Sequence, residues 1–333
     1  MAHTIAVLPQ KDLRNALFSE KAWKELGTLG RVTYEPDADR PPDDSRVRAL
    51  LADATICITS WGSPNLGESA IENASALKLV AHAAGSVKPI VSPALWKRGV
   101  RVTSAAAAIA LGVAETTLGW IIIAAKRGIL ASRVTRAGGW LKDMAFPPGD
   151  LPGKVIGIVG ASHVGRNVIR LLKPFPVTVM VYDPYLSDDD ATALGVVKSE
   201  LDDLMMRSDI VSLHAPKTEE THHMINARNL ALLRDGATLI NTARGALIDE
   251  AAFVEHLRQG RTWAILDVTD PEPPPPDHPF RSLPNVVLTP HFAGTVESGR
   301  SRIGDCVLEE IKRFISGEPL HYEVREEMLP RIG

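Results

Sequence analysis

The chain has 333 residues, a length typical of about two domains. Hydrophobic residues make up 45% and charged residues 23%, and the formal net charge is only -3, so the composition gives no support for nucleic-acid binding or for association with a membrane surface. The two cysteines, Cys57 and Cys306, form neither a CxxC pair nor a disulfide framework, and the N-terminus lacks the pattern of a signal peptide. We therefore expect a reducing, cytoplasmic compartment and no metal site.

The first hundred residues alternate short apolar runs with helical stretches, a rhythm typical of a parallel sheet. Strands are predicted at residues 5–9 (IAVLP), 55–59 (TICIT) and 79–84 (LVAHAA), and a helix around residues 13–26.

The apolar stretch at residues 105–125 is long enough to resemble a membrane span. Glu115, Thr116 and Thr117 interrupt it, and an acid near the centre of a span costs about 2.5–3.5 kcal/mol on insertion scales. We predict a buried helix between domains or subunits, at about residues 113–127. The following residues 138–153 are rich in Gly and Pro and predict a loop.

From residue 154 onward strands and helices alternate more clearly. A helix is predicted at residues 164–172, and a terminal helix at residues 296–315. Near-continuous apolar runs of strand length indicate a parallel sheet covered on both faces. These strands are predicted at residues 155–160, 177–183, 210–216, 237–244, 262–268 and 285–290, whereas the proline run at 272–279 predicts an ordered loop.

A glycine-rich turn, GIVGASHVG (157–165), follows the first of these strands and begins a helix. Gly160 permits the tight turn, and the backbone N–H groups of Ser162, His163 and Val164 would face a pyrophosphate at the helix N-terminus. Ser162 replaces the middle glycine of the usual GxGxxG pattern. Alone the motif is weak, because a packing turn in any α/β protein is an equal alternative.

Asp183 ends the next predicted strand, where a carboxylate would accept hydrogen bonds from an adenosine ribose. A 2′-phosphate at 4 Å would meet a repulsion on the order of 4 kcal/mol per unit charge at an effective dielectric near 20. The sequence therefore predicts NAD rather than NADP, with a solvated turn aspartate as the alternative.

Three later segments place polar residues after strands: INTARGALIDE (240–250), LDVTDPEPPPPDHPF (266–280) and LTPHFAG (288–294). Because ligands bind at the carboxyl ends of strands in open α/β sheets, we expect Arg244, Glu272 and His291 to converge. Arginine suits the carboxylate of a 2-oxo acid, and histidine can exchange a proton with the neighbouring oxygen while a glutamate orients the ring. Each residue taken alone is as readily a structural or solvated group.

The segments NTARG (241–245), LDV (266–268) with Glu272-Pro273, and TPH (289–291) resemble those of the D-isomer-specific 2-hydroxyacid dehydrogenases. The resemblance spans nearly the whole chain. It implies that Arg244 binds the substrate carboxylate, that Glu272 supports the histidine and that His291 is the acid/base.

The resemblance also implies further contacts. Cofactor contacts are implied for His214, Pro216, Thr221, Thr242, Ala243, Asp267 and His291, and substrate contacts for the backbone of Gly85, Ser86 and Val87. After this loop the chain departs from the family, because Lys88, Pro89 and Ile90 stand where an Asn and an acid usually follow, which leaves the substrate open. Trp61 either forms a wall of the substrate pocket or is an ordinary packing residue.

Family members insert a Rossmann cofactor domain into a flavodoxin-like substrate domain, both doubly wound parallel sheets. The sequence predicts residues 1–103 and 295–333 for the substrate domain and 104–294 for the NAD domain. The family also implies a homodimer through the cofactor domain, with the apolar helix near Ile121 as a contact. A non-catalytic NAD-sensing binding protein on the same fold is the alternative function.

Overall fold

The computed structural model describes residues 3–294 and 297–333. The chain divides into two compact units, one of Met1–Ile109 with Thr295–Gly333 and one of Ala110–Gly294. We call them unit 1 and unit 2. The division falls six residues after the boundary that the sequence predicts at 103/104.

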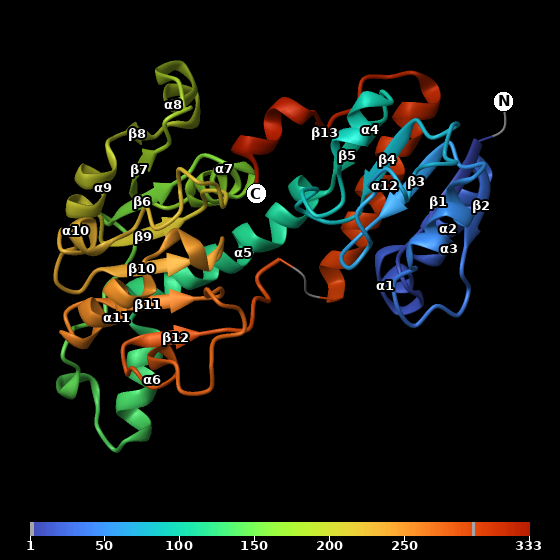
Figure 1. Cartoon of the computed structure of the whole chain (residues 1–333). Helices are drawn as coiled ribbons and strands as arrows, with labels where there is room; N and C mark the ends of the chain where they lie inside the picture. The colour runs from blue at the N-terminus through green and yellow to red at the C-terminus, as the bar shows by residue number, and fades with distance from the viewer. Residues whose placement is uncertain (1–2, 295–296) are drawn as a thin grey trace. The chain divides into compact units, whose positions relative to one another are not determined.

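Unit 1 contains a six-stranded sheet in the order β13-β5-β4-β3-β1-β2 (Figure 1). All neighbouring pairs are parallel except β13 with β5. Read from β2, the order 2-1-3-4-5 is that of a flavodoxin-like sheet, as predicted. The strands are β1 (His3–Val7), β2 (Gly30–Tyr34), β3 (Ile56–Thr59), β4 (Leu79–His82), β5 (Arg101–Ser104) and β13 (Glu323–Val324); the helices are α1 (Lys11–Leu17), α2 (Glu20–Leu29), α3 (Asp44–Leu51), α4 (Pro93–Lys97), α12 (Glu297–Ser316) and the 3-10 helix η4 (Glu326–Arg331).

The single helix predicted at residues 13–26 is wrong, because the chain breaks there into α1 and α2. Phe18 is extended, and the Ser19 side chain accepts a hydrogen bond from the Ala22 backbone N–H (3.2 Å). A serine in this position caps a new helix rather than continuing the old one. The helix predicted at 296–315 is confirmed as α12, although its first residue lies outside the described residues.

Unit 2 contains a seven-stranded, all-parallel sheet in the order β12-β11-β10-β9-β6-β7-β8. This is the Rossmann order 3-2-1-4-5-6 with one further strand, and it confirms the predicted fold class. The strands are β6 (Val155–Val159), β7 (Thr178–Tyr182), β8 (Val197–Lys198), β9 (Ile210–Leu213), β10 (Thr238–Asn241), β11 (Trp263–Leu266) and β12 (Val286–Leu288); the helices are α6 (Gly128–Arg136), α7 (His163–Leu172), α8 (Asp188–Leu194), α9 (Leu201–Arg207), α10 (Ala227–Leu230) and α11 (Glu250–Arg258), with 3-10 turns η1 (Leu141–Asp143), η2 (Gly245–Leu247) and η3 (Pro279–Arg281).

The long apolar helix is α5 (Ala106–Ala125), which begins seven residues earlier than predicted. By length and composition it is the one helix in the described residues that could cross a membrane. Its buried residues Ala114, Ile121 and Ala124 belong to the same core cluster as Ile156 and Ile158 of β6. Ile121 is fully buried in its own chain, whereas Ile123 of the same helix is exposed, so the subunit contact predicted near Ile121 stays a prediction.

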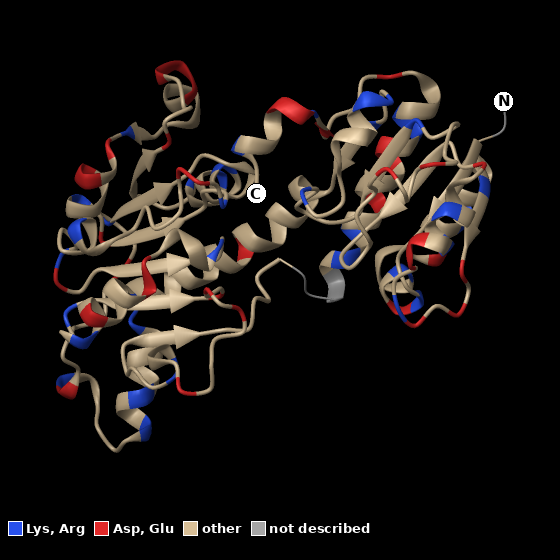
Figure 2. Cartoon of the chain, viewed as in Figure 1, with Lys and Arg blue, Asp and Glu red and all other residues tan. Residues whose placement is uncertain are grey.

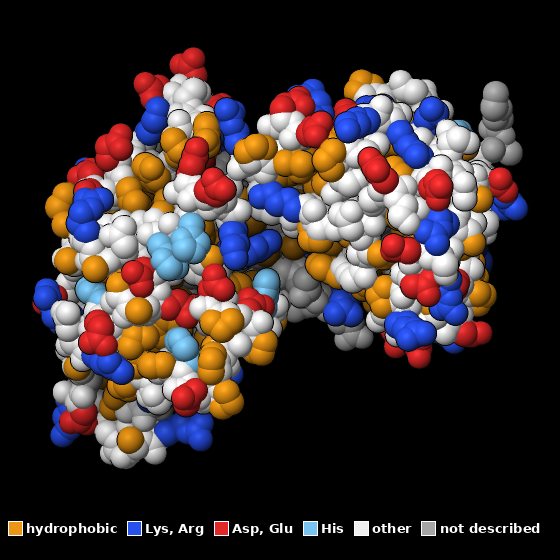
Figure 3. All heavy atoms as spheres, viewed as in Figure 1, with side chains coloured by type: hydrophobic (Ala, Val, Ile, Leu, Met, Phe, Trp, Pro, Cys, Tyr) orange, Lys and Arg blue, Asp and Glu red, His pale blue; other side chains and the backbone are white. Residues whose placement is uncertain are grey.

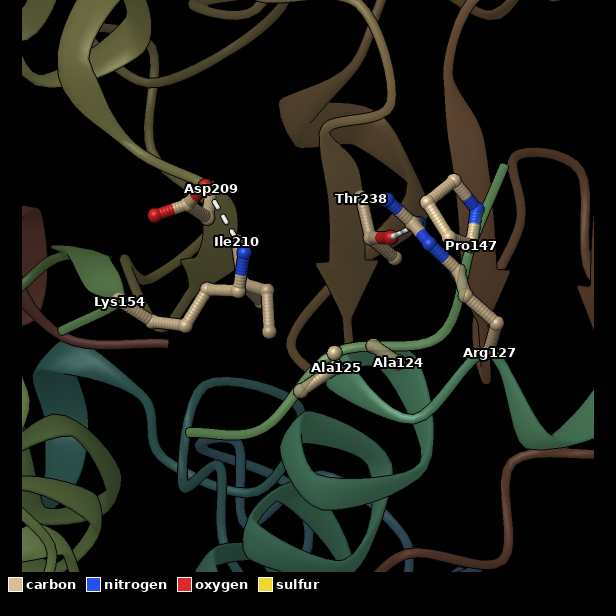
Figure 4. A pocket seen from close by; sticks show the side chains of 9 residues that line it. Ala124, Ala125, Arg127, Pro147, Lys154, Asp209, Ile210 and Thr238 are labelled. Carbon is tan, nitrogen blue, oxygen red and sulfur yellow. Dashed lines mark hydrogen bonds and ion pairs between the residues drawn. The ribbon is translucent and has the colours of Figure 1, made fainter. Parts of the chain in front are cut away.

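A cavity of about 40 Å³ lies at the amino ends of β6, β9 and β10 (Figure 4). Lys154, Asp209, Thr238 and Arg127 line it. This is room for a few water molecules at most. It lies at the sheet edge opposite the one where the glycine-rich turn leaves β6, so it is not a candidate for the cofactor or substrate site.

Charged residues of both signs are mixed over the two units (Figure 2). Figure 3 shows histidine side chains reaching the surface of unit 2 on the visible face. His222 and His223 are two exposed ones, with stacked rings 3.9 Å apart.

Candidate active site

The glycine-rich turn lies where the order of the unit 2 sheet reverses, between β6 and β9. A Cβ at Gly160 would come within 2.7 Å of the Ala215 backbone nitrogen, and one at Gly165 within 2.1 Å of the Gly160 oxygen. Gly160 also has φ +100°, which favours glycine. Ser162 caps α7 by accepting a hydrogen bond from the Gly165 N–H (3.4 Å). These close contacts require glycine at 160 for the tight turn and at 165 for the packing of α7 against it, and a helix N-terminus of this kind suits an anion.

Asp183 follows β7 beside this turn. Its carboxylate accepts hydrogen bonds from the backbone N–H of Ala161 (2.7 Å) and of Tyr185 (2.8 Å). These two bonds fix the side chain between the turn and the segment after β7. A carboxylate oxygen has more than one acceptor position, so a ribose hydroxyl can still bind there.

The residues after β9 lie against this turn. His214 is buried, and neither of its ring nitrogens has a hydrogen-bond partner among the described residues. Burial lowers the pKa of His214 to about 3, so the ring is neutral at physiological pH. The Thr221 hydroxyl donates to the Pro216 carbonyl (2.6 Å), which gives it a role within its own loop. Buried polar atoms are normally paired, so the two His214 nitrogens are an exception beside this turn.

Asp267 is the buried anchor of the segment that carries His291. One carboxylate oxygen accepts from the Thr289 hydroxyl (2.6 Å) and the Phe292 N–H (3.1 Å), and the other from the Ala293 N–H (2.9 Å). The His291 N–H donates to the Asp267 carbonyl (2.8 Å). The Thr242 hydroxyl, buried directly after β10, pairs with Thr117 of α5 (2.9 Å), a contact that no sequence pattern indicates.

The structure brings Glu272 and His291 together at a distance of 2.5 Å between Oε1 and Nδ1. The two side chains are 41% and 43% exposed. Because a carboxylate only accepts, Nδ1 carries the proton and Nε2 is left to exchange one with a substrate. Such a pair is equipped for acid/base chemistry.

His291 has φ +50°, a conformation that a residue other than glycine rarely adopts. Residues held in this way concentrate at functional sites. The bonds from Asp267 to the residues on both sides of His291 are what hold this geometry.

Arg244 immediately precedes the turn η2, three residues after the end of β10, and part of its side chain is exposed. Partial burial lowers the pKa of its guanidinium, and the Glu272 carboxylate nearby raises it; arginine stays charged in either case. A Cβ at Gly245 would come within 2.1 Å of the Thr269 backbone. This close contact joins the arginine segment to the start of the loop that carries Glu272.

In unit 1 the predicted substrate loop follows β4. The Ser104 hydroxyl donates to the carbonyls of Ala84 (3.3 Å) and Gly85 (2.6 Å), and the His82 ring hydrogen-bonds to the Ser86 backbone. In a trans peptide the C=O of one residue and the N–H of the next point in opposite directions. The N–H groups of Gly85, Ser86 and Val87 therefore point away from Ser104 and His82.

His82 and Trp61 are neighbours of this loop. His82 is buried, with Nδ1 2.9 Å from the Thr59 hydroxyl, and burial lowers its pKa to about 4. Trp61 lies in the loop after β3 and is 38% exposed, more than an ordinary packing tryptophan. The Ser60 hydroxyl ties the two loops together by donating to the Ala83 carbonyl (2.8 Å).

The chain is similar to a known protein family. The family model for the NAD binding domain of the D-isomer specific 2-hydroxyacid dehydrogenases matches residues 118–293. The chain belongs to this family. Its membership confirms the resemblance inferred from sequence and NAD as the cofactor expected for unit 2.

Two curated relatives of the family show how far the likeness extends. A D-3-phosphoglycerate dehydrogenase of Methanocaldococcus jannaschii is 34% identical over 270 residues, which are 80% of this chain and 51% of that protein. A glyoxylate reductase of Thermofilum pendens is 34% identical over 307 residues, covering 90% and 89% of the two chains. The chain thus spans about half the length of the phosphoglycerate dehydrogenase.

Solved structures of the dehydrogenase fold match over nearly the full length. The TT0316 protein of Thermus thermophilus matches with TM-score 0.77 and 29% identity, over 97% of this chain and all of the other. The apo D-mandelate dehydrogenase of Rhodotorula graminis matches with TM-score 0.84 over 98% of both chains, at 22% identity. The second likeness shows the fold alone.

The residues of unit 2 fit NAD. Glycines at 160 and 165 allow the tight turn before α7, although Ser162 stands at the middle position. Asp183 accepts hydrogen bonds beside this turn, and His214 has polar atoms without partners among the described residues. Within the described part of the chain, no group of three or more His, Cys, Asp or Glu side chains is placed to hold a metal ion.

We predict that Asp183→Ser shifts the binding preference of unit 2 from NADH toward NADPH. The substitution removes a repulsion on the order of 4 kcal/mol per charge against a 2′-phosphate. Because the site is partly exposed, solvent screens this repulsion, and we expect about a tenfold change in the ratio of the Kd values for NADH and NADPH. Fluorescence titration with both cofactors measures this ratio. An unchanged ratio would show that Asp183 serves only to hold the turn.

Proposed function

We propose that the protein is an NAD-dependent dehydrogenase that interconverts a small 2-oxo acid and its D-2-hydroxy acid. The observation that carries the proposal is the 2.5 Å contact between His291 and Glu272, made in the same unit as the NAD-binding turn. A neutral or charged imidazole beside a carboxylate suits proton exchange with a carbonyl or hydroxyl oxygen.

Each residue has a distinct task in this proposal. Nε2 of His291 donates a proton to the oxo oxygen during reduction and takes it back from the hydroxyl during oxidation. Glu272 holds the ring through Nδ1 and stabilises its protonated form. Arg244 binds the substrate carboxylate through two parallel N–H donors. NAD, when bound, accepts or supplies the hydride.

Unit 1 supplies further donors in this proposal. The N–H groups of Gly85, Ser86 and Val87 are donors of the kind that can bind a carboxylate. Trp61, which Ser60 links to the same loop, offers an apolar surface for the substrate side chain. We propose the remaining cofactor contacts at the backbone of residues 162–164 and at His214, Pro216, Thr221, Thr242, Ala243 and Asp267.

A panel of 2-oxo acids, each assayed with NADH and with NADPH by the loss of reduced-nicotinamide absorbance, tests the activity. Glyoxylate is the first acid to include, because the glyoxylate reductase relative matches over most of both chains. NADH oxidation with at least one acid is the expected result. NADH binding without oxidation across the panel would overturn the proposal in favour of a non-catalytic NAD sensor.

We also propose that the protein is a homodimer formed through unit 2. The helix α6 has no buried residue in its own chain, and Ile123, Trp140 and Leu141 on either side of it are exposed. Large apolar side chains gathered on one segment mark an interaction surface. A second copy of the chain is the occupant that we propose.

Light scattering after size exclusion tests the dimer. The unsubstituted protein is expected at twice the mass of the 36.0 kDa chain, and the pair Trp140→Asp with Leu141→Asp is expected to shift it to the monomer. Met206→Asp, at an exposed apolar residue of α9, is the matched control and leaves the mass unchanged. A monomeric parent protein would refute this arrangement.

Both cysteines are free in the structure. We propose a reducing, cytoplasmic location on this basis, which cell fractionation tests.

A further inference from the structure

The loop that carries Glu272 contains few backbone donors. Residues 271, 273–276 and 279 are prolines, which lack an N–H group. Within the described residues 270–280, one backbone N–H donates a hydrogen bond to a residue outside the loop. That N–H belongs to Asp270. A loop of this kind depends on side chains of the surrounding structure to fix its position.

Glu250, the first residue of α11, provides such side-chain contacts at both ends of the loop. Its Oε1 accepts the Asp270 N–H (2.8 Å), and its Oε2 lies 3.3 Å from Nε2 of His278. The Glu250 side chain is only 13% exposed. In the sequence Glu272 lies between these two contact points, two residues after Asp270.

The hydrogen bonds fix the protonation of this pair. Nδ1 of His278 accepts the Phe280 N–H (3.3 Å), so a neutral His278 ring carries its proton on Nε2 and donates it to Glu250. Burial lowers the pKa of His278 and raises the pKa of Glu250 to about 7; the Asp270 N–H hydrogen bond opposes this rise, and the charge of the Asp270 carboxylate adds to it. The other charged groups beside the pair are Lys217, whose Nζ lies 3.7 Å from the Asp270 carboxylate, and Asp277 and Arg281 near His278.

We propose that Glu250 is a positioning residue that holds the proline loop so that the Glu272 carboxylate reaches Nδ1 of His291. This inference rests on the proposed function, since it assigns Glu250 a task only if His291 is the acid/base. Glu250 does not itself contact the substrate in this proposal. It acts by fixing the backbone at Asp270.

The substitution Glu250→Ala removes both contacts. Glu272 then spends less time at His291, so the hydrogen bond from Nδ1 weakens and the proton-donating form of the ring is less well held. In 2-oxo acid reduction the ring must donate a proton, so the falling limb of kcat/KM is expected to move to lower pH. We expect kcat at pH 8 to fall about tenfold, with the Kd for NADH unchanged.

Two variants serve as controls. Glu250→Gln keeps an oxygen for the Asp270 N–H, so it is expected to retain kcat within about threefold and to keep the limb in place. Glu255→Ala, an exposed residue of the same helix, leaves both unchanged. If Glu250→Ala does not fold, Glu250→Asp serves in its place. It keeps the charge but is one methylene too short to reach Asp270, so the same changes in kcat and in the pH limb are expected.

NMR detection of the His291 Nδ1 proton that is hydrogen-bonded to Glu272, in labelled protein, separates this proposal from the proposed function, because it needs no substrate. A weakened or lost Nδ1 proton signal in Glu250→Ala, recovered in Glu250→Gln, supports the role of Glu250 even if no 2-oxo acid is reduced. An unchanged Nδ1 signal, or a loss of kcat with the pH limb in place, overturns it, since either outcome leaves only a general structural contribution.

Discussion

Replacing His291 with alanine is expected to lower kcat for 2-oxo acid reduction by about 100- to 10,000-fold, the range for loss of a positioned acid/base. NADH binding should persist, because the turn at Gly160 and the carboxylate of Asp183 belong to other parts of unit 2. Single-turnover measurement of NADH oxidation with a saturating 2-oxo acid gives the ratio of rates. His321→Ala, at an exposed histidine of unit 1, is the matched control.

The pH dependence of the two proteins separates a chemical role from a structural one. The unsubstituted enzyme should lose reduction rate as pH rises, because the imidazole must donate a proton. The residual activity of His291→Ala should lack this limb. A variant that keeps near-normal turnover and the same pH profile would remove His291 from the mechanism.

Replacing Arg244 with alanine is expected to lower kcat/KM for a 2-oxo acid by about 10- to 150-fold. A charge-assisted hydrogen bond contributes about 1.5–3 kcal/mol, and the substitution leaves the substrate carboxylate without its arginine. Arg244→Lys should recover only part of the loss, since lysine cannot form the planar pair of bonds. Steady-state kinetics at several substrate concentrations measure the effect.

An uncharged substrate provides the sharper control for Arg244. A 2-oxo amide lacks the carboxylate, so the unsubstituted enzyme should reduce it poorly and Arg244→Ala should reduce it about as well. Arg258→Ala, at an exposed arginine of α11, should affect neither substrate. Equal losses with the acid and the amide would mean that Arg244 shapes the site instead of binding the carboxylate.

The two sheets and the strongest site residues could be predicted from the sequence for physical reasons. Buried parallel strands are continuous apolar runs, and strand ends carry the residues that meet a ligand. For that reason the runs before Gly160, Arg244 and His291 could be recognised. The short strands β2 and β5 were missed, because their sequences GRVTY and RVTS are mixed in polarity.

The contacts that support the site could not be predicted from the sequence. Glu250 is twenty residues from Asp270 and Thr117 is 125 residues from Thr242, and no local pattern marks either pair. Asp267 stays a predicted cofactor contact, and the side-chain hydrogen bonds by which it holds the segment around His291 are a second role that no local pattern indicates. A signal for Glu250 did exist: the proline loop has few donors, so a buried acid near it is a candidate anchor.

A crystal structure with NAD and oxamate, an unreactive analogue of a 2-oxo acid, examines the mechanism at the atoms that perform it. We expect Nε2 of His291 within hydrogen-bond distance of the oxamate carbonyl oxygen, with the Arg244 guanidinium paired to the carboxylate. Oxamate bound with its carbonyl away from His291, or with its carboxylate held without Arg244, would contradict the assignment of these residues.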